Sequence, residues 1–142
     1  MINKKGFTLI ELLAVIAIIA LISLVAIPNI VGLSTGIRKD NMIDDAKKLI
    51  SLAKYQVNKS YDIRTNPPHT FTFNELNING DLKTDPDGGD YDKDNSFVTY
   101  SVENNVAEYC VTLIGSQRSI GKNGCIKEKN LHSRSNVVDN ET

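Results

Sequence analysis

The sequence lacks the short signatures that mark most catalytic and nucleotide-binding sites. It contains no GxSxG nucleophile turn, no HExxH zinc motif, no GxxxxGK[ST] phosphate loop and no GxGxxG dinucleotide fingerprint. The only histidines, His69 and His132, have no cysteine or carboxylate at a spacing typical of metal ligands. We therefore expect that the protein is not an enzyme.

Strong net charge is absent as well, because the 142 residues carry a formal charge of −1. The charges are unevenly distributed: Lys4 and Lys5 precede a long apolar run, whereas residues 62–142 carry an excess of carboxylates. No basic patch suited to nucleic acid is recognisable.

Cysteine is scarce, with only Cys110 and Cys125, both far beyond the apolar run. If that run anchors the chain with Lys4 and Lys5 on the cytoplasmic side, both thiols lie outside the cell, where a disulfide can form. A bond enclosing about 15 residues would contribute roughly 3 kcal/mol through loop entropy. Two unpaired buried thiols are the alternative, and we favour the bond.

The apolar run covers residues 7–27 and is interrupted only by Thr8, Glu11 and Ser23. At about 1.5 Å per residue, a helix of this length crosses a hydrocarbon core of roughly 30 Å. A secretory signal peptide is the first alternative, but there the small cleavage-site residues follow the apolar stretch. Here the small residue, Gly6, precedes it, so cleavage after Gly6 would keep the run and create a new α-amine on Phe7.

Glu11 is an ionisable residue inside this run, which is by default a hypothesis about function. In the first turn of a helix a carboxylate is favoured by the helix dipole by about 0.3–1 kcal/mol, and that alone could explain it. Alternatively, Glu11 pairs with a positive charge of a neighbouring subunit. Because an unpaired buried charge typically costs about 3–5 kcal/mol, such a pair would fix how far one helix slides along the next.

The stretch KKGFTLIELL holds basic residues followed in order by Gly6, Phe7, Thr8, Leu9 and Glu11. It resembles the class III signal of type IV pilins and of their relatives, the pseudopilins of type II secretion and competence systems. The resemblance covers roughly the first 30 residues of the chain.

The resemblance implies that a prepilin peptidase cuts between Gly6 and Phe7 and methylates the amine of Phe7. It also implies that Glu11 engages the amine of a subunit already in the filament. Pro28 matches the helix-kinking proline of the family, and we expect the helix to bend or open locally near residues 24–28.

For the whole chain the resemblance implies a type IV pilin, the structural subunit of a filament. The chain would cross the bacterial cytoplasmic membrane once with its N-terminus inside. The pilus assembly machinery would then incorporate it into a homo-oligomeric helical pilus at the cell surface. Such filaments serve adhesion, twitching motility, DNA uptake or secretion. The alternatives are a pseudopilin and a membrane-tethered binding module.

The predicted organisation is a leader of residues 1–6, an apolar helix over 7–35 and a head domain over 36–142. Within the head, residues 37–61 predict an amphipathic helix, because apolar residues recur every three or four positions. Pro67 and Pro68 cannot continue it, so it should stop by Asn66. Its apolar stripe comprises Met42, Ile43, Ala46, Leu49, Ile50, Ala53, Val57 and Tyr61.

Alternating apolar residues over 96–103 and 107–114, separated by Asn104-Asn105, predict an antiparallel hairpin. Residues 70–73 are expected either to begin a strand or to pack on the helix, and residues 119–120 and 126–128 are expected to add a third strand. The tail, residues 130–142, has little apolar content and is expected to be mobile. The fold class is therefore α+β, with a long N-terminal helix packed on a small antiparallel sheet.

The segment KTDPDGGDYDKDN gathers aspartates on a turn rich in glycine and proline. Oxygen ligands at alternating positions could wrap Ca²⁺, although no glutamate closes the loop as in an EF-hand. Carboxylates on a solvated turn are the commoner explanation, and no other cofactor is indicated. The candidate ligands are Asp85, Asp87, Asp90, Asp92 and Asp94.

Overall fold

The computed structural model describes Gly6 and residues 8–140, with the side chains of residues 25–33 left undescribed. The chain divides into two compact units, Met1–Gly36 and Ile37–Thr142. Helix α1, Leu9–Lys59, belongs to both units. Its helical assignment continues without interruption through residues 24–28, so the local opening expected near Pro28 is not seen in the backbone. The side chain of Pro28 lies outside the described residues.

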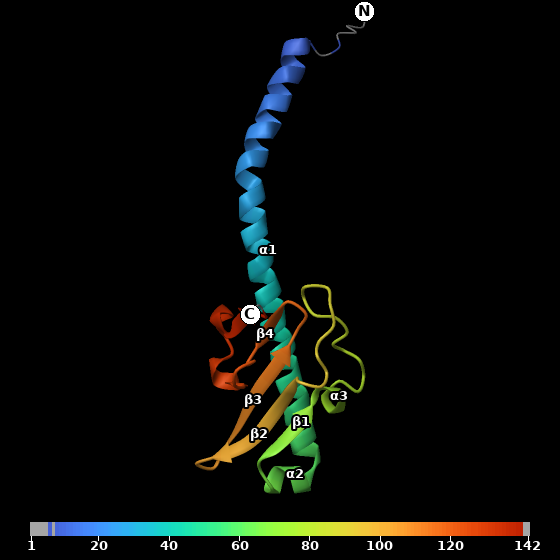
Figure 1. Ribbon diagram of the computed structural model, residues 1–142, viewed down its shortest axis with the longest axis vertical. Coiled ribbons are helices and arrows are strands. Elements are labelled where there is room, and N and C mark those ends of the chain that lie inside the picture. Colours follow the sequence, from blue (N-terminus) through green and yellow to red (C-terminus); the bar gives the residue numbers. More distant parts are fainter. Residues whose placement is uncertain (1–5, 7, 141–142) are drawn as a thin grey trace, which may run out of the picture. The chain divides into compact units, whose positions relative to one another are not determined.

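The second unit is an α+β domain, as predicted (Figure 1). Its sheet is antiparallel in the order β1-β2-β3-β4-β6, with β5 paired to β3. The elements after α1 are α2 Tyr61–Thr65, β1 His69–Thr72, α3 Phe73–Leu76, β2 Phe97–Glu103, β3 Val106–Ile114, β4 Arg118–Ile120, β5 Ile126–Lys127, the 3₁₀ turns η1 Glu128–Asn130 and η2 Arg134–Asn136, and β6 Val137–Asp139.

The predicted hairpin is present as β2 and β3. Val98 pairs with Val111 and Tyr100 with Tyr109, and all four side chains are buried on the core face of the sheet. Successive strand residues point to opposite faces, so the neighbours of these residues lie on the outer face. The turn at 104–105 places both asparagines at positive φ, 53° and 64°, a conformation that asparagine tolerates better than most residues.

The hydrophobic core of this unit joins the amphipathic part of α1 to the sheet. Along α1 the buried residues are Met42, Ile43, Ala46, Leu49, Ile50, Ala53 and Val57, which is the predicted stripe except for its last member. Tyr61 is 70% exposed, contrary to that prediction. The reason is local: α1 ends at Lys59, and Ser60 is extended and caps α2 by accepting a hydrogen bond from the Ile63 N–H.

The last described segment of the chain, residues 130–140, packs against the rest of the second unit. Leu131 is fully buried, Val137 is 4% exposed, and β6 pairs with β4 at the edge of the sheet. The tail was expected to be mobile because its apolar residues are few and isolated. Those few apolar residues are sufficient to hold the tail against the domain, because they fill the core and add a strand to the sheet.

Candidate functional site

The first turn of α1 closes with a reciprocal pair of hydrogen bonds. The Thr8 N–H donates to Glu11 Oε2 at 3.0 Å, and the Glu11 N–H donates to Thr8 Oγ1 at 3.2 Å. This is a capping box, in which the two side chains satisfy two N–H groups that the helix itself leaves unpaired. The role of Thr8 was not predicted from the sequence, although the Thr-x-x-Glu spacing is the known signature of a capping box.

The capping box leaves part of the Glu11 carboxylate free for another partner. Both Thr8 and Glu11 are exposed, and Glu11 Oε1 accepts no hydrogen bond within the described part of the chain. The capping geometry therefore accounts for one oxygen of this carboxylate without occupying the other. Gly6 is exposed with open space around it, while Phe7 lies outside the described residues.

The helix that follows Glu11 exposes apolar side chains on all sides. The exposed apolar residues between positions 9 and 24 follow one another so closely that they lie on every side of the helix, and none of them is buried by other described residues. Contiguous exposed apolar surface of this kind marks contact with a membrane or with another protein. The exposed residues are Leu9, Ile10, Leu12, Leu13, Val15, Ile16, Ile18, Ile19, Leu21, Ile22 and Leu24.

Among the residues that the structure describes, no helix combines the length and the apolar character needed to cross a bilayer. The segment expected to span, residues 7–27, includes Phe7 and the side chains of residues 25–27, which are not described.

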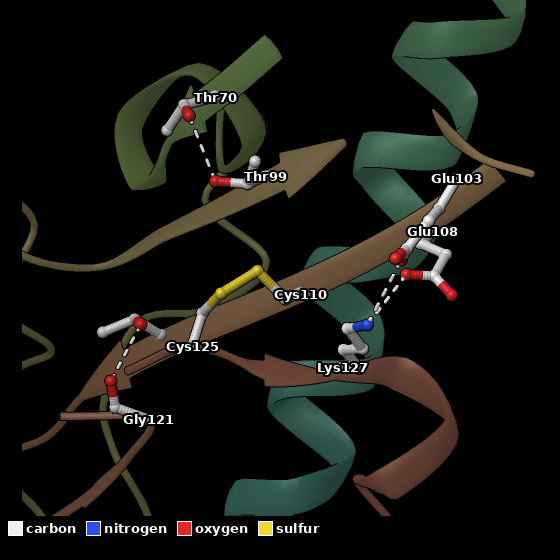
Figure 2. The surroundings of a disulfide bond; sticks show 9 residues. Thr70, Thr99, Glu103, Glu108, Cys110, Gly121, Cys125 and Lys127 are labelled. Atoms are coloured by element: carbon white, nitrogen blue, oxygen red, sulfur yellow. Dashed lines mark hydrogen bonds and ion pairs between the residues drawn. A yellow bond between two sulfur atoms is a disulfide. The ribbon is translucent and has the colours of Figure 1, made fainter. Parts of the chain in front are cut away.

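In the second unit, Cys110 and Cys125 form the favoured disulfide (Figure 2). Cys110 lies on β3, Cys125 directly precedes β5, and their Cα atoms are 5.4 Å apart. The return turn needs glycine at position 121, where φ is +70° and an added Cβ would lie 2.7 Å from the Val111 carbonyl oxygen. The Thr112 hydroxyl donates to the Gly121 carbonyl at 2.9 Å, which fixes this turn against β3.

The aspartate-rich loop is held by protein contacts, and Asp85 is its centre. Asp85 is 4% exposed. Its Oδ1 accepts from the N–H groups of Asp87 and Gly89, both at 2.9 Å, and its Oδ2 accepts from the Ser116 N–H. Burial alone would raise the pKa of Asp85, but the hydrogen bonds donated by Ser116, Gly89 and Asp87 outweigh it and hold that pKa below its usual value.

The other candidate calcium ligands lie in different surroundings and share no common partner among the described residues. Asp87 forms ion pairs with Arg118 at 2.5 Å and Arg38 at 3.6 Å. Asp92 accepts hydrogen bonds within its own turn, and Asp90 and Asp94 are exposed. Across the described residues, no three His, Cys, Asp or Glu side chains lie close enough together to hold a metal ion. The aspartates of the candidate calcium loop therefore do not form such a group within the described residues.

Residues 1–27 match a protein family described as the prokaryotic N-terminal methylation motif. The chain carries the class III signal of type IV pilins. This signal supports a pilin-type or pseudopilin-type prepilin, and the matching family is structural rather than enzymatic. No curated protein and no solved structure shows significant similarity to the chain.

The prepilin signal implies three events in general terms: processing by a prepilin peptidase, insertion into a membrane, and assembly at the surface by dedicated machinery. Thr8 and Glu11 both lie after the predicted cleavage between Gly6 and Phe7. Their hydrogen bonds can therefore persist after processing.

Removing the Thr8 hydroxyl should loosen the start of α1. A Thr8→Val chain keeps the side-chain shape but gives the Glu11 N–H no acceptor, and losing a cap costs about 0.5–2 kcal/mol. We expect faster amide hydrogen exchange at residues 9–12 of the full chain in detergent, with recovery in Thr8→Ser.

The chain offers a matched control for this substitution. Thr72 and Glu75 form a second capping box at α3, with the same two distances of 3.0 and 3.2 Å. Thr72→Val should loosen α3 and leave α1 unchanged. Unaltered exchange at residues 9–12 in Thr8→Val would contradict the capping role.

Replacing Asp85 should destabilise the second unit in a pH-dependent way. Asp85→Asn turns one acceptor into a donor that faces N–H groups, so the free energy of unfolding at pH 7 should fall by about 1–3 kcal/mol. The folded pKa lies below the unfolded value of 3.8, so this contribution is present above pH 3.8 and is lost as the pH falls through the folded pKa.

Urea unfolding of the full chain in detergent between pH 3 and 7 measures this effect. The difference between wild type and Asp85→Asn should shrink on acidification. Asp94→Asn is the control, because Asp94 is exposed in the same loop and its change should stay within about 0.5 kcal/mol. Equal effects of the two substitutions would argue against the contacts described for Asp85.

Proposed function

We propose that the chain is a type IV pilin, the structural subunit of an extracellular filament built through α1. The match of residues 1–27 to the methylation motif carries this proposal. Under this proposal, the prepilin peptidase cuts between Gly6 and Phe7 and methylates the amine of Phe7. The assembly machinery then moves the mature subunit from the cytoplasmic membrane into a homo-oligomeric pilus.

The exposed apolar surface of residues 9–24 supports a role in packing. In the membrane this surface faces lipid, and apolar helices there gain little by pairing with one another. Outside the membrane the same surfaces gain about 25 cal/mol per Å² when they bury against neighbouring copies. Apolar contact thus supplies cohesion but little directional preference.

Glu11 supplies the missing direction. One carboxylate oxygen is held by Thr8, and the other, which accepts no hydrogen bond from the described residues, can accept one from the cationic amine of Phe7 of a neighbouring subunit. Such a pair inside an apolar bundle is worth far more than at a surface, because water no longer screens it. Subunits that slip along one another lose the pair, so the charges fix the register.

The test is the composition of filaments sheared from cells. Electron microscopy should show thin surface filaments, and mass spectrometry should find this chain beginning at a methylated Phe7. Filament subunits that retain residues 1–6 would contradict the proposal. So would a mature chain found only in the membrane of cells without filaments, which is the outcome expected of a membrane tether.

A further inference from the structure

The outer face of the sheet, opposite the hydrophobic core, contains a hollow of about 520 Å³. Phe97 of β2 and Thr112 of β3, which are register partners, both line it. They lie on the outer face because their strand neighbours Val98 and Val111 are buried in the core. The volume lies within the range of about 300–1,000 Å³ typical of small-molecule sites.

Contacts within the protein hold the walls of this hollow in place. The Asp92 N–H donates to the Ile114 carbonyl at 2.8 Å, which ties the loop before β2 to the end of β3. Cys125, which also lines the hollow, is bonded to Cys110 of β3 (Figure 2). The side chain of Asn140 donates to the Gly115 carbonyl at 2.7 Å. A site built this way needs little ordering when a ligand enters.

The polar groups of the hollow include both donors and acceptors that can still form hydrogen bonds. Asn95 donates one amide hydrogen to Asp92 at 2.8 Å, while Asn95 Oδ1 accepts no hydrogen bond from the described residues. The Lys122 ammonium makes one long contact, 3.4 Å, to the Asn140 carbonyl, and it has three donors in all. The hollow can therefore both donate to a ligand and accept from it.

The formal charges of the two charged side chains that line the hollow add up to zero. They are Asp92 and Lys122. The hydrogen bond from the Asn95 side chain, more than any other contact, holds the pKa of Asp92 below its usual value, so this group is ionised at neutral pH. An anion or a cation entering the hollow would be attracted by one of these two charges and repelled by the other.

We infer that this hollow binds a neutral saccharide unit, with one sugar face against the Phe97 ring. A sugar carries hydroxyls that can both donate and accept hydrogen bonds, and it presents an apolar C–H face on which an aromatic ring can stack. It needs no compensating charge. The hollow supplies each of these features: an aromatic side chain, mixed donors and acceptors, and no net charge.

The test is NMR titration of the ¹⁵N-labelled full chain in a phosphocholine detergent, which carries no sugar. The probes are glucose, galactose and their N-acetylated amines. At least one should shift the amides of residues 92–97, 112–114 and 121–125 with a dissociation constant on the order of 1 mM. Phe97→Leu, which keeps an apolar side chain without a ring, should weaken this binding about tenfold.

Ser101→Ala is the matched control, because Ser101 lies on the same strand face and does not line the hollow. It should bind as wild type does. Unperturbed amides with all four sugars would overturn the inference, as would equal binding by Phe97→Leu. Stronger binding of inorganic phosphate, lysine or uridine than of any sugar would assign the hollow to another ligand class.

Discussion

Glu11→Gln is expected to yield a subunit that reaches the membrane and is cleaved normally, yet assembles no surface filaments. Glutamine retains an oxygen that can accept from the Thr8 N–H, so the cap on α1 can persist. It removes only the charge that would pair with a neighbouring amine. Breaking a buried ion pair costs about 3–5 kcal/mol per contact, which corresponds to about a 100-fold or greater loss of assembly.

This substitution separates the two explanations of Glu11. If the carboxylate served only the helix dipole and the cap, the loss would be within about 1 kcal/mol and filaments would persist. Glu75→Gln, in the capping box of α3, is the matched control and should assemble normally. Filament counts by electron microscopy, with mass spectrometry of the N-terminus, measure both variants. Wild-type filament numbers in Glu11→Gln would refute the ion-pair role.

The double variant Cys110→Ser, Cys125→Ser should lose about 3 kcal/mol of unfolding free energy. The bond closes a loop with a sequence separation of 15, and a loop of this length restricts the unfolded chain by about that amount. The loss should be large for this domain, because domains of this size are stable by only about 5–15 kcal/mol in total.

Urea unfolding of the full chain in detergent measures this loss. Reduced wild-type protein is the control, since it keeps both sulfur atoms and lacks only the bond. It should unfold at nearly the same urea concentration as the double variant. A difference below about 1 kcal/mol between oxidised and reduced wild type would show that the bond contributes little.

Local patterns allowed much of the fold to be predicted. The stripe from Met42 to Val57 follows from helical spacing, and the pairing of Val98 with Val111 follows from alternation around Asn104-Asn105. The favoured disulfide is present in the structure. The Thr8 cap was missed, although its spacing to Glu11 is visible in the sequence.

The remaining features depend on contacts between distant residues. Asp85 accepts from Ser116 and Asp87 pairs with Arg118, each across a separation of 31 residues. No local pattern shows that these partners exist, so the aspartates appear available to a metal when the sequence is considered alone. The hollow beside Phe97 is assembled in the same way, from a loop, two strands, a turn and the chain end.

The tip of the β2–β3 hairpin has a practical use in microscopy. Residues 104–105 are exposed, and the pairing of the two strands ends just before them. A fluorescent label or short affinity tag inserted there would avoid both the packed strand β6 and the N-terminal prepilin signal. Living cells could then be imaged without adding any sequence to either end of the chain.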